Sequence, residues 1–192
     1  MSDQTKADNV VPVGSWQRVA SEQLADCKVF QVRQDRCVSS RDGREHKFYC
    51  IEAPAWVNVI ALTPDKQLVL IEQFRHGSEE ITLELPGGMA DEGEDPHLSA
   101  ARELLEETGY AAREVITLGK SRPNPAIQNN WVHHFLALDA ELKQNTEFDE
   151  TEDVVTRLVP LSDVPQLIAS GKISHALVLA AFYWFNLWQA RK

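Results

Sequence analysis

The sequence of 192 residues contains only three cysteines, and they follow none of the patterns that build a cysteine framework. Their number is odd and no CxxC pair occurs, which argues against a disulfide scaffold or a zinc–thiolate site. We expect all three to be reduced and half-buried in strands: Cys27, Cys37 and Cys50. The sequence also has no GxxxxGK[ST] loop, which excludes a P-loop triphosphatase, and no GxSxG nucleophile elbow.

Positive charge and long apolar runs are scarce as well. With 29 acidic against 19 basic residues the net charge is -10, which argues against nucleic acid or an anionic membrane surface as the main partner. This charge suits metal cations, or substrates delivered with them. The one long apolar run, ALVLAAFYWF at 176–185, is too short to span a bilayer, and we interpret it as a buried helix with the cations of LWQARK in its last turn.

The N-terminal stretch MSDQTKADNVVPVG is polar and lacks the apolar core of a targeting segment. We expect residues 1–13 to form a flexible arm and the protein to be cytoplasmic. Hydrophobic residues make up 43% of the chain, which is enough for the core of one domain.

The remaining segments predict strands with a few helices among them. Residues 28–53 alternate in polarity around the turn RDG, which predicts a β-hairpin. WVNVIALT and QLVLIEQF predict a second hairpin, and three more strands are expected in ITLELPGG, WVHHFLALDA and DVVTRLVPL. LSDVPQLIASG predicts a short helix ended by Gly171. Adjacent His133 and His134 would point to opposite faces of a strand, so a histidine metal site is not expected. The mixture is typical of an α+β or α/β sandwich.

The clearest predicted helix is DPHLSAARELLEETGY. Asp95 is a suitable N-cap, Pro96 occupies the first helical position, and Gly109 is placed to end the helix. At 100° per residue, one side gathers the apolar residues Leu98, Ala101, Leu104 and Leu105. The opposite side gathers three carboxylates, those of Glu103, Glu106 and Glu107.

Like charges one turn apart destabilise a helix by a few tenths of a kcal/mol per pair. For an arbitrary helix, such a patch is simply a solvated acidic face. Two features favour a metal site instead: no basic residue is interleaved among the carboxylates, and the glycine turn PGGMADEGE lies immediately upstream. Hard cations such as Mg²⁺ prefer oxygen ligands and neutralise closely spaced carboxylates.

The stretch GMADEGEDPHLSAARELLEETGY, 23 residues beginning at Gly88, resembles the signature of the Nudix hydrolase family in full. The one departure is the last position, usually aliphatic, which is Tyr110 here. The resemblance implies an α/β/α sandwich whose loop-helix-loop motif carries divalent metals. It also implies an enzyme that cleaves a nucleoside diphosphate linked to another moiety at the pyrophosphate. By position, it implies Mg²⁺ or Mn²⁺ ligands at Glu103, Glu106, Glu107 and the Gly87 carbonyl. It also implies structural support from Gly88, Glu94 and Arg102.

Stretches outside this signature resemble the ADP-ribose and nucleoside diphosphate sugar pyrophosphatase branch: IEQFR, LELPGGMADEGE and SRPNPAIQNN. That branch implies substrate-binding roles for Arg75, Glu84 and Pro125. Arg75 would contact the phosphates or the terminal sugar, although it can also be an exposed strand-end cation. Glu84 would be a partner of Arg75 or of a metal-bound water, or an exposed strand residue. Pro125 would shape the pocket, or be an ordinary turn proline.

The branch further implies an α/β fold with an extra N-terminal antiparallel sheet at residues 14–55, ahead of a Nudix domain at 56–192. This sheet would help form a homodimer and its substrate pocket. The first candidate substrate is ADP-ribose; GDP-mannose, a broad range of nucleoside diphosphate sugars, and a catalytically silent ligand sensor remain alternatives. A general base is expected in the acidic loop EFDETED, in the order Glu150, Glu152 and Asp149, with a helix glutamate such as Glu106 as the fallback.

Overall fold

The computed structural model describes residues 13–146 and 153–191. The chain divides into two compact units, with the boundary between Glu52 and Ala53. The sequence predicts this boundary between residues 55 and 56. The predicted base candidates Glu150 and Glu152, like Asp149, lie outside the described residues, as does nearly all of the predicted arm.

The N-terminal unit is a three-stranded antiparallel sheet in the order β1-β2-β3. Its strands are β1 (Trp16–Asp26), β2 (Gln31–Ser39) and β3 (Glu45–Glu52). The predicted hairpin at 28–53 is confirmed as β2 and β3, and β1 adds a strand that the sequence did not single out. Both edge strands expose apolar side chains, among them Trp16, Val19 and Leu24 on β1 and Phe48 and Tyr49 on β3.

The second unit is built on a mixed sheet in the order β11-β5-β4-β9-β8, with β6 also paired to β5. Its strands are β4 (Trp56–Leu62), β5 (Gln67–Arg75), β6 (Glu80–Glu84), β8 (Glu114–Ser121), β9 (Val132–Leu138) and β11 (Val154–Pro160). The short strands β7 (Tyr110–Ala111) and β10 (Glu141–Leu142) form a separate pair. Every strand predicted in this region is confirmed, whereas β8 was not predicted.

Strand β5 is paired on both of its sides. Its residues 71–73 face β11 on one side and β6 on the other, both antiparallel. The residues on either side of this stretch also have partners, because β4 pairs with Leu68 and Val69, and β6 continues along β5 as far as Arg75.

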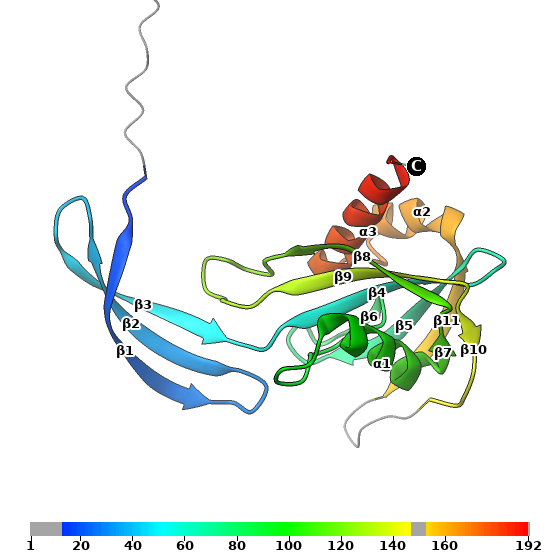
Figure 1. The fold of residues 1–192 in the computed structure, drawn as a ribbon, viewed down its shortest axis with the longest axis horizontal. Helices are drawn as coiled ribbons and strands as arrows, with labels where there is room; N and C mark the ends of the chain where they lie inside the picture. Colours follow the sequence, from blue (N-terminus) through cyan, green and yellow to red (C-terminus); the bar gives the residue numbers. More distant parts are fainter. Residues whose placement is uncertain (1–12, 147–152, 192) are drawn as a thin grey trace, which may run out of the picture. The chain divides into compact units, whose positions relative to one another are not determined.

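Helices cover both faces of this sheet, as Figure 1 shows. Helix α1 (Pro96–Thr108) packs on one face, where Ala100 and Leu104 join a cluster with Val59 and Phe135. Helices α2 (Val164–Ala169) and α3 (Ala176–Gln189) cover the other face, preceded by the 3-10 turn η1 (Leu161–Asp163). The predicted α/β/α sandwich with an extra N-terminal antiparallel sheet is therefore confirmed. Among the described helices, none is both long and apolar enough to cross a membrane.

Two details of the predicted helices are wrong. Helix α3 ends at Gln189, where the chain closes on the carbonyls of Asn186 and Trp188, so Arg191 follows the helix instead of lying in its last turn. The predicted apolar face of α1 is also displaced, because Leu98 is 62% exposed and Ala101 is exposed too. The face that packs on the sheet carries Ala100, Leu104, Glu107 and Thr108.

Gly109 ends α1 in the left-handed region, at φ 73°, and a Cβ there would lie 2.1 Å from the carbonyl oxygen of Gln144. Gly93 has a similar φ of 79°, with nothing within 4 Å of a Cβ. We therefore expect Gly93→Ala to lower the free energy of unfolding by about 1 kcal/mol, the penalty of a left-handed alanine. Gly109→Ala should cost at least about twice as much, because backbone must also move. Equal losses in urea denaturation would contradict this reading of the Gln144 contact.

Candidate active site

The loop before α1 lies directly on strand β4. The backbone N–H of Val57 donates to the Gly88 carbonyl and that of Val59 to the Pro86 carbonyl, both at 2.9 Å. A Cβ on Gly87 would lie 2.1 Å from the Val57 carbonyl oxygen, so no side chain fits there. Between these two carbonyls, the Gly87 N–H donates to Glu107 of α1 instead.

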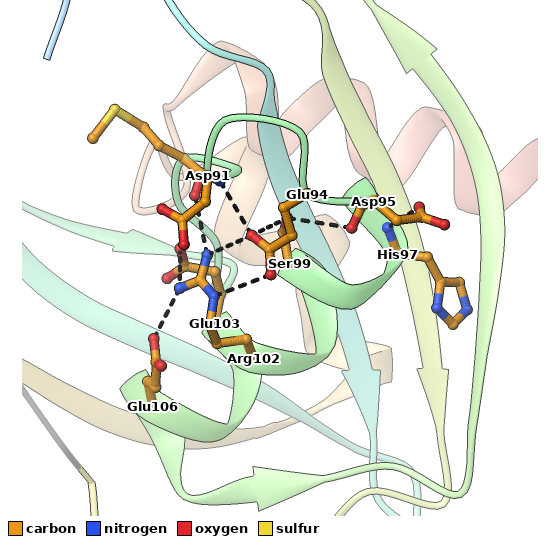
Figure 2. A network of polar contacts seen from close by, with 9 residues as sticks. Asp91, Glu94, Asp95, His97, Ser99, Arg102, Glu103 and Glu106 are labelled. Atoms are coloured by element: carbon orange, nitrogen blue, oxygen red, sulfur yellow. Dashed lines mark hydrogen bonds and ion pairs between the residues drawn. The ribbon is translucent and has the colours of Figure 1, made fainter.

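The start of α1 is fixed by its own sequence. The Asp95 side chain accepts a hydrogen bond from the His97 N–H at 2.9 Å, and Pro96 follows at the first helical position. These two residues define where the helix begins, and therefore which side its glutamates present. The loop and helix together bring the carboxylates of Glu94, Glu103 and Glu106 into one region (Figure 2).

Arg102 connects the loop to the helix. Figure 2 shows its guanidinium between Glu94 of the loop and the glutamates of α1. Its Nη2 donates to Glu94 Oε2 at 3.1 Å and to the Met89 carbonyl at 3.2 Å. Its Nη1 donates to Glu103 at 3.1 Å and to Glu106 at 3.0 Å. One cation therefore contacts three carboxylates and a loop carbonyl.

Glu94 is the anchor of the loop. Its carboxylate accepts hydrogen bonds from Arg102, from the Ser99 hydroxyl at 2.7 Å and from the Asp91 N–H at 3.1 Å. Together these bonds lower the pKa of Glu94 to about 2. The pair of residues that the sequence assigns to structural support is thus in contact.

The three glutamates of α1 differ in their surroundings. Glu107 is buried at 6% exposure, and its Oε2 accepts a hydrogen bond from the Gly87 N–H at 2.8 Å. The Glu103 carboxylate lies against Gly88, where a Cβ would come within 2.6 Å of it. The Glu106 side chain is the most open, at 41% exposure. The sequence predicts that no basic side chain lies among these carboxylates. In the folded protein this is wrong, because the Arg102 guanidinium lies between Glu103 and Glu106.

These donors fit a hard divalent cation by their chemistry. Glu103 and Glu106 both bind the same nitrogen of Arg102, so their carboxylates converge, and Glu107 reaches the loop through the Gly87 N–H. All the candidate ligands are oxygens, as Mg²⁺ and Mn²⁺ prefer. Within residues 13–146 and 153–191, no group of three acidic, histidine or cysteine side chains is already arranged around one point.

Arg75 and Glu84 form a second polar centre where β5 pairs with β6. Arg75 binds Glu84 through two parallel hydrogen bonds of 2.8 Å. Glu84 also accepts from the Thr82 hydroxyl and from Nδ1 of His175, both at 2.6 Å. Burial by itself raises the pKa of Glu84, but the hydrogen bonds from Arg75, His175 and Thr82 outweigh it and keep this pKa well below its usual range.

Exposure separates the two members of this pair. The Glu84 side chain is 3% exposed and that of Arg75 is 44% exposed. A ligand can therefore reach the Arg75 guanidinium more readily than the Glu84 carboxylate. The buried carboxylate is suited to orienting the guanidinium. Sequence reasoning missed His175 and Thr82; the only available signal was that Thr82 shares a strand face with Glu84.

The other residues noted in the sequence are Pro125, His133 and His134. Pro125 is exposed in the turn at 124–128. His134 is fully buried in β9 and bonds Ser121 at 2.8 Å, and burial lowers its pKa to about 4. His133 is only partly buried. His134 is therefore neutral at neutral pH and belongs to the core.

The Glu94 contacts predict an acid-sensitive loop. A carboxylate whose pKa is about 2 in the folded protein, against about 4.3 in an unfolded chain, stabilises the fold above pH 4.3. This stabilisation declines as the pH falls towards 2. Glu94→Gln should therefore have a lower urea midpoint than the parent protein at pH 6, and the difference should shrink between about pH 4 and pH 2. A difference that is constant with pH would contradict the assignment.

Comparison with known proteins agrees with this geometry. The family model of the NUDIX domain matches residues 53–182. The chain is 31% identical over 173 residues to an ADP-ribose pyrophosphatase of Bacillus subtilis, covering 90% of this chain and 93% of the relative. It is 30% identical over 175 residues to a methanol dehydrogenase activator of Bacillus methanolicus, covering 91% and 94%.

A crystal structure of an ADP compounds hydrolase superposes with a TM-score of 0.81 at 23% identity, covering 93% of this chain and 96% of that one, which shows a shared fold. Hydrolases of the matched family generally use divalent metal ions. The family match spans the loop, α1 and the sheet that carries them, and so the chain belongs to the NUDIX family.

Proposed function

We propose that the protein is a metal-dependent pyrophosphohydrolase of nucleoside diphosphate sugars, with ADP-ribose as the first candidate substrate. The observation that carries this proposal is the acidic set of α1, held against the glycine loop by Arg102 at Glu103 and Glu106 and by the Gly87 N–H at Glu107. Similarity over 90% of this chain to an ADP-ribose pyrophosphatase supports the substrate class. Water would add to one phosphorus and the P–O–P bond would break, giving AMP and ribose 5-phosphate.

Glu103, Glu106, Glu107 and the Gly87 carbonyl would bind Mg²⁺ or Mn²⁺. When bound, such cations polarise phosphoryl oxygens and lower the pKa of water. Arg102 keeps Glu103 and Glu106 together, and the Gly87 N–H orients Glu107. Arg75 would bind the negative charge of the pyrophosphate or the terminal sugar, with Glu84 orienting its guanidinium and Pro125 shaping the rim of the pocket.

Three alternatives differ from ADP-ribose hydrolysis in their substrate or in lacking catalysis. GDP-mannose, or a broad set of nucleoside diphosphate sugars, would use the same metal chemistry. A catalytically silent ligand sensor would bind such a compound without releasing a monophosphate, and it would not need the complete acidic set. A panel of sugar nucleotides with Mg²⁺, scored for release of a monophosphate, separates these three functions.

Metal dependence is the first expected result. Glu107→Gln should reduce kcat for ADP-ribose by at least about 10²-fold, because it removes a charged oxygen ligand. The fold should remain intact, since the Gln side-chain oxygen can still accept from the Gly87 N–H. The matched control is Glu92→Gln, which changes an exposed carboxylate of the same loop and should leave kcat unchanged. Full activity in excess chelator would refute the proposed mechanism.

The general base is proposed in the acidic stretch EFDETED, at Glu150 first and Glu152 second. A carboxylate that takes the proton of the attacking water would add about 10²–10⁴-fold to the rate. Single changes to Gln at 149, 150 and 152, assayed at saturating Mg²⁺, should lower kcat strongly at one glutamate with little change in KM. Near-normal kcat in both Glu150→Gln and Glu152→Gln would move the base to a helix glutamate such as Glu106.

We also propose a cytoplasmic homodimer that uses the N-terminal sheet. Support comes from the exposed apolar side chains on the edge strands of this sheet. Among them, the rings of Trp16 and Phe48 pack edge to face, with their centroids 4.9 Å apart. Exposed strand edges with apolar side chains tend to find a partner. Sedimentation at micromolar concentration should give twice the chain mass of 21.6 kDa, and a species of single chain mass would contradict the dimer.

A further inference from the structure

The Glu84 carboxylate accepts four hydrogen bonds in the second polar centre. Each of its oxygens has two donors: Oε1 accepts from Thr82 and from Arg75 Nε, and Oε2 accepts from Arg75 Nη2 and from His175 Nδ1. With both oxygens occupied in this way, the plane of the carboxylate is fixed. Since Arg75 binds it through two parallel bonds, the direction of the guanidinium is fixed as well.

His175 is the one donor that comes from a distant part of the chain. It lies 91 residues from Glu84 and is the N-cap residue of α3. Thr82, in contrast, is two residues from Glu84 on the same strand. The contact of 2.6 Å therefore connects the beginning of α3 to the end of β6, three residues before Gly87.

Because His175 is the N-cap residue of α3, its contact with Glu84 costs the helix a capping hydrogen bond. Serine, threonine, asparagine or aspartate at an N-cap normally bonds the first free N–H groups of the helix. The His175 side chain makes no such bond, because its ring is directed to Glu84 instead. The chain thus places at this position a residue that caps α3 poorly but donates to Glu84.

We propose that His175 is a positioning residue that fixes Glu84 and, through it, the Arg75 guanidinium at the substrate site. The inference rests on the proposed function, in which Arg75 binds the pyrophosphate or the terminal sugar. Since an ionised carboxylate only accepts, Nδ1 of His175 carries the proton in this contact. His175 takes no part in bond making or breaking; it restricts the rotation of Glu84.

The decisive variant is His175→Ser, which removes the donor to Glu84 and supplies a good N-cap. We expect its melting temperature to equal or exceed that of the parent protein, while kcat/KM for ADP-ribose falls about tenfold, as for loss of a charge-assisted hydrogen bond. His175→Gln keeps a side-chain N–H donor and should recover part of this loss. Ser174→Ala, at the exposed neighbouring residue, is the matched control and should change neither quantity.

If His175 acts by positioning Arg75, the loss of kcat/KM in His175→Ser should depend on the presence of Arg75. In an Arg75→Ala background, His175→Ser should change kcat/KM by less than twofold, because the group being positioned is already gone. Three results would overturn the proposal: a normal kcat/KM in His175→Ser, an undiminished effect in the Arg75→Ala background, or a fall in activity that only parallels a fall in melting temperature.

A second measurement does not depend on turnover. The Arg75 Nε–H, which donates to Glu84, can be followed by nitrogen-15 NMR and assigned by its disappearance in Arg75→Lys. Its exchange with water should be faster in His175→Ser and unchanged in Ser174→Ala. If the parent protein hydrolyses no sugar nucleotide, the proposed function fails, and this exchange rate still decides the positioning role. Unchanged exchange in His175→Ser would overturn that role even in an active enzyme.

Discussion

The site depends on one guanidinium that contacts more acids than it can neutralise. Arg102 binds the carboxylates of Glu94, Glu103 and Glu106 and the carbonyl of Met89. Among these contacts, one positive charge faces three negative charges. The contacts are therefore sufficient to assemble the loop on the helix but leave negative charge for a bound cation. This balance explains how like charges can remain one turn apart in a stable helix.

The loop is fixed from two directions at once. Strand β4 binds the carbonyls of Pro86 and Gly88, and α1 binds the Gly87 N–H through Glu107. Because the loop lies between a strand and a helix, a side chain at Gly87 would meet the Val57 backbone and one at Gly88 would meet the Glu103 carboxylate. Close packing against backbone therefore requires glycine at 87, whereas a side chain at 88 would displace Glu103.

Local signals predicted the parts of the structure that local chemistry determines. Asp95, Pro96 and Gly109 were sufficient to place α1, because capping involves only neighbouring residues. The buried face of α1 was mispredicted because Glu107 is buried with a backbone partner, and a pattern based on apolar residues cannot include a carboxylate. His175 was missed for a related reason: its partner is 91 residues away, and only the packing of α3 on the sheet brings the two together.

The double pairing of β5 has a consequence for the dynamics of the arginine that this strand carries. Residues 71–73 have neighbouring strands on both sides, so their amides should exchange with solvent only when the whole unit unfolds. Arg75 extends from this strand, whereas Arg102 and Glu94 connect a surface loop to a helix. Motions faster than global unfolding should therefore leave the β5 backbone that carries Arg75 in place. In the proposed site, β5 would then be a fixed reference for the part of a ligand that Arg75 binds.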